Sequence, residues 1–336
     1  MTRLYMGVKI FVLRLQSEKH RVIIQTVAKN ATKEGFLMKK KIMKLDVHVH
    51  SVFEKWGILE PNSSWTTPKE LRAMYDELGI EKGVQLPLNS PEGRNQIISN
   101  HESYKLAQAH PDQYVWFCNP DPREGNNTPG YDLGVFLRFY KSMGAKGVGE
   151  VTANLPFDDP YMENLFKHCE MEEMPLLFHM GVKNRSYGIV DDIGMPKLEG
   201  ALQKFPKLEF IAHSTQFWSQ ISGDVTPETF LSYPKGPVAP GGTVVRLLDK
   251  YPNLSLDISA GSGQNAIIRD REFGLWFLET YKDRIYFGTD ICAPKNQVIL
   301  SHYLDDAMEA GDISYEAYEK ISRENLSRLL NREIKL

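Results

Sequence analysis

The stretch LDVHVH, residues 45–50, decides the fold of this chain. Apolar and polar residues alternate in it, which is typical of a short β-strand. Successive side chains of a strand point to opposite faces, so we expect His48 and His50 on one face. Two imidazoles on a rigid strand form half of a metal site, because imidazole binds zinc, iron and similar divalent ions. The pair alone leaves a second interpretation open, in which both histidines are simply hydrogen-bonded core or surface groups.

Strand-like and helix-like patterns alternate along the rest of the chain. Eight segments have the strand pattern: 44–50, 81–88, 114–119, 146–151, 175–180, 207–213, 253–259 and 284–290. Each precedes a helical pattern, near 67–78, 94–109, 131–143, 160–173, 196–205, 242–251, 264–282 and 296–308, and a helical tail covers 314–330. Eight such units predict an α/β fold, the (β/α)8 or TIM barrel, over about residues 44–330. A doubly wound open sheet is the alternative, but no glycine-rich phosphate-binding motif follows the first strand.

Polar residues lie at the carboxyl ends of these predicted strands, where barrel enzymes place their chemistry. Four of the nine histidines fall within the last three residues of a strand, which random placement would rarely produce. The strand ends carry His48, His50, Asn119, Glu150, His179, His213, Asp257 and Asp290. A site built from histidine and carboxylate groups is therefore expected at this end of the barrel.

Charge divides the chain into two parts. Of 40 basic and 43 acidic residues, 11 and 2 lie in residues 1–44, so a basic leader precedes an acidic body. We predict a leader over 1–42, either a marginal hairpin or disordered, and a barrel domain over 43–336. The leader could also contact an anionic surface or act as a targeting peptide. It could equally be a start-site artefact, since Met38 and Met43 lie just before the first predicted strand. An acidic body is not expected to bind nucleic acid.

The remaining composition indicates a cytoplasmic enzyme-sized protein. The three cysteines form no CxxC pair, which fits a reducing compartment. The longest apolar run near the start, residues 10–13, is too short for a signal peptide or a membrane span. We expect a small-molecule substrate and no membrane partner, and homo-oligomerisation stays open.

The ordered motifs resemble the amidohydrolase superfamily. These motifs are the HxH at 48–50, the histidines that end the fifth and sixth strands, and the GTD at 288–290. The stretches IAHS (211–214), YPNLSLD (251–257) and YFGTD (286–290) resemble its amidohydrolase-related (amidohydrolase 2) branch of metal-dependent hydrolases and decarboxylases. The resemblance covers about residues 43–330 and implies a TIM barrel with one or two divalent ions, expected to be Zn²⁺.

Carried over residue by residue, the resemblance assigns His48, His50, His179 and Asp290 to the metal. A catalytic zinc keeps three or four protein ligands and lowers the pKa of its water to roughly 7. Asp290 would then also accept the water's proton. In isolation, an aspartate after a strand is more often a helix cap.

Glu150 and His213 have several interpretations each. Many superfamily members carry a carboxylated lysine where this chain has Glu150, and Lys146 lies at the other end of the same strand. Glu150 could bridge two ions, orient a histidine or bind substrate. His213 could bind a second ion, act catalytically on a substrate oxygen, or be a core histidine.

Further residues are predicted to bind substrate. Lys183, Arg185 and Arg269 are candidates for clamping a carboxylate. Trp218, with Phe217 and Tyr187, is a candidate wall for an apolar or aromatic substrate. For each of these six residues, a role on the solvated surface or in packing is at least as consistent with the sequence.

Three functions follow from these residues. The first is metal-dependent hydrolysis of an amide, lactone or ester. The second is non-oxidative decarboxylation on the same scaffold, which often places Gly-Glu after the sixth-strand histidine where this chain has the sequence STQ at 214–216. The third, a catalytically silent metal-binding barrel, would need a lost ligand, and none is missing.

Overall fold

The computed structural model describes residues 40–55, 64–92, 97–185 and 187–332. The chain divides into two units, Met1–Lys40 and Lys41–Leu336. All described residues except Lys40 belong to the second unit. The predicted leader and its hairpin lie almost entirely outside the described residues, so the boundary at residue 42 stays a prediction.

The described strands fall into two sheets in which every pairing is parallel. The first has the order β1-β2-β3, with bounds Lys44–Val49, Ile80–Gln85 and Tyr114–Trp116. The second has the order β4-β5-β7-β8-β9, with bounds Val148–Val151, Leu176–Gly181, Phe210–His213, Leu254–Asp257 and Ile285–Tyr286. A short strand β6, Ile189–Val190, pairs with β5 outside this order.

Backbone hydrogen bonds join the two sheets at both junctions. Between the β3 and β4 segments, Gly149 N–H donates to Cys118 O at 2.8 Å. Between the β9 and β1 segments, Asp290 N–H donates to His48 O at 2.8 Å. The eight strands of the described residues, β6 aside, therefore form a closed parallel ring. This arrangement confirms the predicted (β/α)8 barrel.

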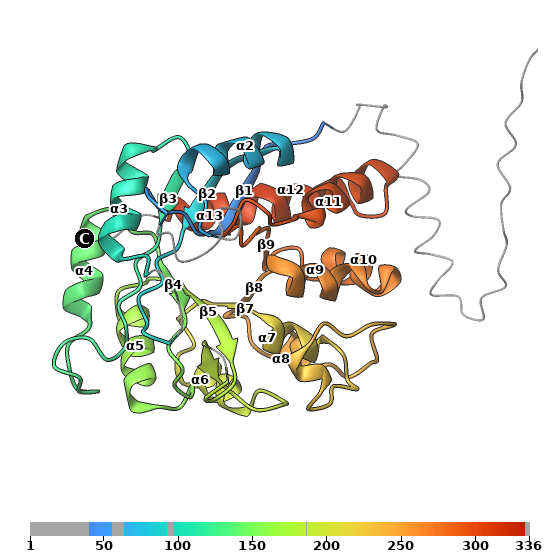
Figure 1. Cartoon of the computed structure of the whole chain (residues 1–336). Helices are drawn as coiled ribbons and strands as arrows, with labels where there is room; N and C mark the ends of the chain where they lie inside the picture. Colours follow the sequence, from blue (N-terminus) through green and yellow to red (C-terminus); the bar gives the residue numbers. More distant parts are fainter. Residues whose placement is uncertain (1–39, 56–63, 93–96, 186, 333–336) are drawn as a thin grey trace, which may run out of the picture. The chain divides into compact units, whose positions relative to one another are not determined.

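Helices follow the strands and lie outside them (Figure 1). The α-helices are α2 Pro68–Leu78, α3 Asn100–Ala109, α4 Gly134–Ser142, α5 Pro160–Met171, α6 Pro196–Lys204, α7 Thr215–Trp218, α8 Thr243–Lys250, α9 Ala260–Ile268, α10 Arg271–Thr280, α11 Ile299–Ala310, α12 Tyr315–Glu319 and α13 Asn325–Leu330. Short 3₁₀ segments cover Ser219–Ile221 and Thr229–Leu231, and a π-helical turn, Lys320–Glu324, joins α12 to α13.

Local sequence explains why α2 begins and ends where it does. The Thr67 side chain accepts from Glu70 N–H, and the Glu70 carboxylate accepts from Thr67 N–H at 2.8 Å. This reciprocal pair and Pro68 at the first helical position form a capping box. The helix ends at Gly79, whose φ of +69° few other residues adopt.

Two predicted elements differ from the structure. The expected helix over 264–282 is two helices, α9 and α10, and it begins earlier, at Ala260. The break falls at Asp270, whose side chain accepts Phe273 N–H and so caps α10 rather than continuing α9. The segment after β7, for which the sequence predicted no helix, contains the short helix α7.

An apolar cluster fills the ring. It combines residues of β1, β2, β5, β7 and β9 with residues of α13: Leu45, Val47, Val84, Leu86, Leu177, Ile211, Tyr286, Leu326 and Leu329. Because β1 and β5 are not neighbours in the ring, their side chains can meet only inside it. This packing closes the barrel interior and leaves the strand ends to carry polar groups.

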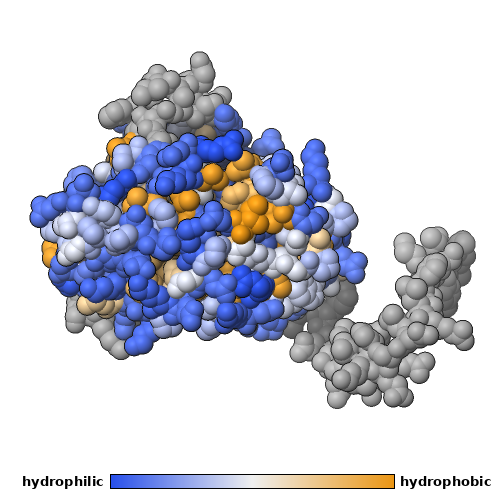
Figure 2. Space-filling view, turned by 90° about the horizontal axis from the view of Figure 1, so that it is seen from below, coloured by the Kyte–Doolittle hydropathy of each residue, from blue (hydrophilic) through white to orange (hydrophobic). Residues whose placement is uncertain are grey.

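One face of the molecule is seen in a space-filling view. Figure 2 shows a mainly hydrophilic face on which hydrophobic residues form separate patches. None of the helices that the structure describes has the length and apolar character required to span a bilayer.

Candidate metal centre

The first strand presents its two histidines together, but a register shift interrupts it. The pairing with β2 shifts between Asp46 and Val49. His48 Nε2 lies 3.0 Å from His50 Nε2, as expected for side chains on one face. Asp46 instead bonds to the α2 residue Tyr75, whose hydroxyl donates to Asp46 Oδ2 at 2.7 Å. The regular alternation predicted for residues 45–50 therefore holds for the histidines and fails for Asp46.

Ligand atoms from three strand ends surround the two histidine nitrogens of β1. Glu150 Oε2 lies 3.5 Å from His48 Nε2 and 3.2 Å from His50 Nε2. Asp290 Oδ1 lies 3.4 Å and 3.6 Å from the same two nitrogens. A tetrahedral ion with bonds of about 2.0–2.1 Å needs ligand atoms about 3.3 Å apart. Each carboxylate oxygen, together with the two nitrogens that lie 3.0 Å apart, therefore has separations that suit ligands of a divalent ion.

Hydrogen bonding on the far side of each imidazole supports this fit. His50 Nδ1 lies 3.0 Å from the carbonyl oxygen of Leu86, which can only accept, so Nδ1 carries the proton. His48 Nδ1 lies 2.7 Å from Asp257 Oδ2. When both imidazoles are neutral, both Nε2 atoms offer lone pairs, facing each other and two carboxylate oxygens. Acceptors placed this close repel one another unless a cation or a proton lies between them.

The pKa shifts of His48 and Glu150 also indicate a site that attracts positive charge. Burial opposes protonation of His48, but nearby carboxylates, Asp290 foremost, outweigh it and raise its pKa well above the usual value. Burial also opposes ionisation of Glu150, yet the contacts with His48 and two other histidines hold the pKa of its carboxyl well below normal. The pocket therefore favours positive charge strongly, as a metal site does.

Glu150 also belongs to a second group of ligand atoms. Its Oε1 lies 2.7 Å from His179 Nδ1. Ligand atoms of Glu150, His179 and His213 all lie within 4.8 Å of one another. The neighbouring residue Gly149 has φ +139°, and a side chain there would come within 2.5 Å of the Leu177 carbonyl oxygen, so only glycine fits. Glu150 thus stands between two possible ion positions, one on each carboxylate oxygen.

The structure shows His179 in contact with Glu150, a contact that the sequence left open. The sequence grouped it with His48, His50 and Asp290 around one ion. In the structure its Nδ1 faces Glu150, and β5–β7 pairing sets His179 opposite His213. The Glu150 carboxylate lies between His179 on one side and His48 and His50 on the other. All five predicted ligands nevertheless lie in one connected cluster.

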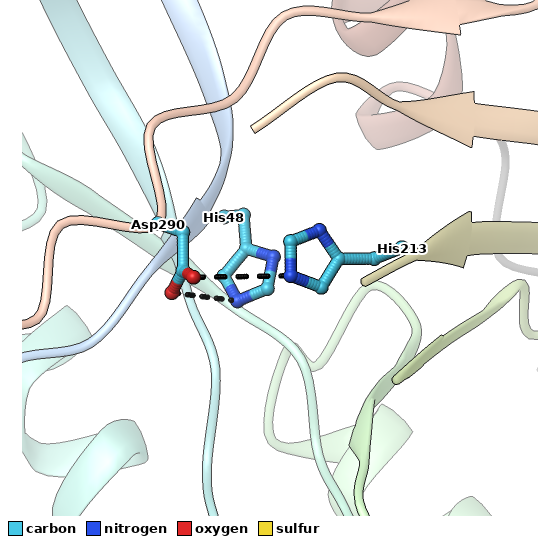
Figure 3. A group of neighbouring side chains, drawn as sticks. All are labelled: His48, His213 and Asp290. Carbon is cyan, nitrogen blue, oxygen red and sulfur yellow. Dashed lines mark ion pairs between the residues drawn. The ribbon is translucent and has the colours of Figure 1, made fainter. Parts of the chain in front are cut away.

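Asp290 faces both groups. Its Oδ1 lies 3.4 Å from His48 Nε2 and its Oδ2 lies 3.8 Å from His213 Nε2 (Figure 3). Its side chain is 26% exposed, unlike the fully buried His48, so a substrate could reach it. Thr289, just before it, donates from N–H and Oγ1 to Asp46, at 2.9 and 2.6 Å. This network fastens the end of the eighth strand to the first.

Two predicted substrate residues are placed away from the cluster. Trp218 is only 2% exposed, and its indole N–H donates to the backbone oxygen of Asp257 at 3.1 Å, so it packs in the core and does not wall a substrate. Arg269 ends α9, whose nine residues extend about 13 Å from the strand end. Burial lowers the pKa of its guanidinium, and the opposing charges are Asp224 and Asp270 rather than the ligand cluster.

Lys183 and Arg185 lie on the segment that follows β5, as the sequence predicted. Both are exposed on the segment after β5, two to four residues beyond the end of that strand. The ring of Tyr187, also named from the sequence, lies 4.5 Å from that of His179. Contact of these side chains with a substrate stays a prediction.

Three residues near the cluster have structural roles or positions that the sequence did not predict. Asn119 donates from its side chain to the backbone oxygen of Glu150 at 2.5 Å, which holds the carboxylate-bearing strand end. Asp46 precedes the HxH by two residues. Two of its four hydrogen bonds, both from Thr289, fasten the first and eighth strand ends, and the other two come from His48 N–H and the Tyr75 hydroxyl. The Trp65 ring, 5.8 Å from that of His50, had no signal in the sequence.

Comparisons with known proteins bear on the fold. No family model and no curated protein matches the sequence. Solved structures do match. A dihydroxybenzoic acid decarboxylase from Polaromonas sp. JS666, with bound manganese and 2-nitroresorcinol, gives a TM-score of 0.54 at 16% identity, covering 87% of this chain and 98% of that one.

Two further matches have similar scores. A probable 2-pyrone-4,6-dicarboxylic acid hydrolase from Acinetobacter baumannii gives 0.52 at 11% identity, covering 86% and 99% of the two chains. A structure titled amidohydrolase II gives 0.51 at 14% identity, covering 86% and 100%. This chain shares their fold. The resemblance predicted from the motifs is thus confirmed at the level of the fold.

Proposed function

We propose that this chain is a metal-dependent enzyme of the amidohydrolase-related type, most simply a hydrolase of an amide, lactone or ester. One observation supports this above all: at the carboxyl end of a TIM barrel, carboxylate oxygens of Glu150 and Asp290 each lie within 3.6 Å of both His48 Nε2 and His50 Nε2. A probable hydrolase and a decarboxylase with the same fold support an enzyme, and the manganese bound in the decarboxylase supports a divalent ion.

The residues fit Zn²⁺ in the first group and a second ion between Glu150, His179 and His213. Histidine nitrogen and carboxylate oxygen suit zinc and manganese alike. A divalent ion held there supplies Lewis acidity to a substrate oxygen and to water. The ligands' own task is to present their lone pairs from rigid strand ends, which keeps the site preorganised.

Asp290 is the proposed proton acceptor. Its Oδ1 faces the ligand nitrogens, while Oδ2 faces His213 and its side chain is partly exposed. Asp290 can therefore take a proton from the attacking water and return it to the leaving group. His213 Nε2, 3.8 Å from Oδ2, is placed to hold a substrate oxygen or to relay that proton.

Two measurements test this function. Elemental analysis of protein purified without chelator should find one or two divalent ions per chain. A screen of lactones, amides, esters and aromatic acids in ¹⁸O-labelled water should find label in the new carboxylate of a hydrolysed substrate. Protein without metal at any added Zn²⁺ or Mn²⁺ concentration would contradict the proposal.

Decarboxylation is the second candidate. It is favoured by the manganese-containing decarboxylase that shares the fold. In this chain Ser214 follows the sixth-strand histidine, and its hydroxyl accepts Met180 N–H at 3.2 Å and so has a structural task. A decarboxylase would release carbon dioxide and place no solvent oxygen in the product, so the same labelling assay separates the two reactions.

A further inference from the structure

Two histidines of the cluster share one carboxylate oxygen. His48 Nδ1 lies 2.7 Å from Asp257 Oδ2, and His213 Nδ1 lies 3.2 Å from the same atom. His48 and His213 come from strands β1 and β7, and Asp257 ends β8. All three side chains are almost completely buried, so water does not compete for these contacts. The Ser259 hydroxyl oxygen also lies 3.1 Å from His213 Nδ1 and 3.4 Å from His48 Nδ1.

The Asp257 side chain is itself held in place. Ser259 donates from its hydroxyl to Oδ2 and from its N–H to Oδ1, both at 2.9 Å. Trp218 donates to the backbone oxygen of Asp257 at 3.1 Å. Both carboxylate oxygens and the carbonyl therefore have partners, and the carboxylate has little freedom to rotate away from either imidazole.

The position of each Nδ1 proton determines what the opposite nitrogen can do. When Nδ1–H donates to Asp257, Nε2 carries the lone pair. His48 Nε2 lies 3.4 Å from Asp290 Oδ1, and His213 Nε2 lies 3.8 Å from Asp290 Oδ2. One carboxylate thus directs two lone pairs toward the same catalytic aspartate.

We propose that Asp257, held by Ser259, is a positioning residue that sets the Nδ1–H tautomer of His48 and His213 together. Its consequence for metal binding rests on the function proposed above, whereas its effect on the tautomers does not. Carboxylates that orient metal-bound histidines are typically worth ten- to a hundredfold in metal affinity. Here a single carboxylate orients two histidines of different strands.

The first test uses ¹⁵N-labelled protein without metal, at a pH above the raised pKa of His48, where its imidazole is neutral. Histidine ¹⁵N shifts distinguish the two neutral tautomers, and His48→Gln and His213→Gln identify the signals. In Asp257→Asn both histidines should lose the Nδ1–H signature together. The matched control is Asp191→Asn, which changes a carboxylate equally buried at 3% exposure that accepts N–H groups of Asp192, Lys197 and Leu198. That variant should leave both signals unchanged.

The second test measures Zn²⁺ affinity by chelator competition. Asp257→Asn should bind about ten- to a hundredfold more weakly, Ser259→Ala should lose less, and Asp191→Asn should match wild type. A change at only one histidine, or at neither, overturns the inference. If wild type binds no Zn²⁺, the proposed function fails and the tautomer experiment alone decides. If Asp257→Asn does not fold, unchanged spectra and affinity in Ser259→Ala overturn the inference.

Discussion

Glu150 is in contact with three histidines and uses both of its carboxylate oxygens to reach them. One carboxylate oxygen faces His48 and His50, and the other faces His179. A carboxylate that uses both oxygens in this way can hold two ions or one ion and an orienting histidine. The sequence left these roles open, and the structure places the carboxylate between His179 and the two histidines of β1.

Glu150→Gln should therefore weaken metal binding. Glutamine has a similar shape but no charge, and its NH₂ group would meet either His179 or the two Nε2 atoms. We expect a loss of affinity of about ten- to a hundredfold if Glu150 only orients a histidine, and more if it bridges two ions. Competition with a chelator and the metal content per chain measure both quantities.

The matched control is Glu199→Gln. Glu199 forms ion pairs with Arg246 and Lys250 on the outside of the barrel. Metal content should be unchanged in that variant. Wild-type affinity in Glu150→Gln would remove Glu150 from the site.

Asp290 is the residue whose change should affect turnover more than metal binding. Asp290→Asn keeps an oxygen near His48 and His50 but loses the base. Turnover should fall by about 10²–10⁴, the usual contribution of general acid–base catalysis, while most of the metal remains. Steady-state kinetics beside metal analysis check this expectation. Wild-type turnover would exclude Asp290 as the base, and loss of metal would show that its ligand role dominates.

At the scale of elements, a buried ion pair fastens the start of the first strand to two helices. Lys44 Nζ lies 2.6 Å from Asp305 Oδ1 on α11, and the α12 residue Tyr318 donates to the same oxygen at 2.8 Å. Lys44 is only 1% exposed. Burial lowers the pKa of its ammonium group, although Asp305 partly offsets this effect. Such a pair fixes the register of β1 against the outer helices.

Breaking this pair from one side should destabilise the fold strongly. Lys44→Met leaves the Asp305 carboxylate buried without its cation, which typically costs about 3–5 kcal/mol. The double variant Lys44→Met/Asp305→Leu should recover most of that loss, because no charge stays buried. Urea unfolding of the two variants and wild type measures the difference. Equal stability of the single and double variants would show that the pair is not coupled.

At the scale of the whole molecule, the closed ring explains why residues so far apart in sequence form one site. The first and eighth strand ends, about 240 positions apart, are joined by Asp290 N–H to His48 O and by Thr289 to Asp46. A ring without edges places all carboxyl strand ends around one axis. Every ligand can then reach the centre from its own strand.

The leader should be dispensable for this assembly. A shortened chain that begins at Met43 loses the Ile42 N–H bond to the Tyr318 hydroxyl, at 3.3 Å, and the Lys41–Glu309 ion pair, at 3.1 Å. A neutral hydrogen bond contributes about 1 kcal/mol and an exposed ion pair about 0–1 kcal/mol. Thermal unfolding and metal content should therefore be close to those of the full chain. Insolubility of the shortened chain would show that residues 1–42 are required for folding.

Local patterns in the sequence were sufficient for the elements and for the members of the site. Strand alternation, the capping box at Thr67 and the polar strand ends depend only on neighbouring residues, so they could be read without a structure. They predicted the barrel and brought His48, His50, Glu150, His179, His213 and Asp290 to one end of it.

The tertiary structure alone decided how these residues are arranged. The shift in β1 turns Asp46 toward Tyr75, and Glu150 lies between His179 and the two histidines of β1. Trp218, read as a substrate wall, is a buried donor, and Asp257 serves two histidines. These outcomes depend on contacts between side chains of distant strands, and periodicity along one strand contains no information about what faces it across the ring.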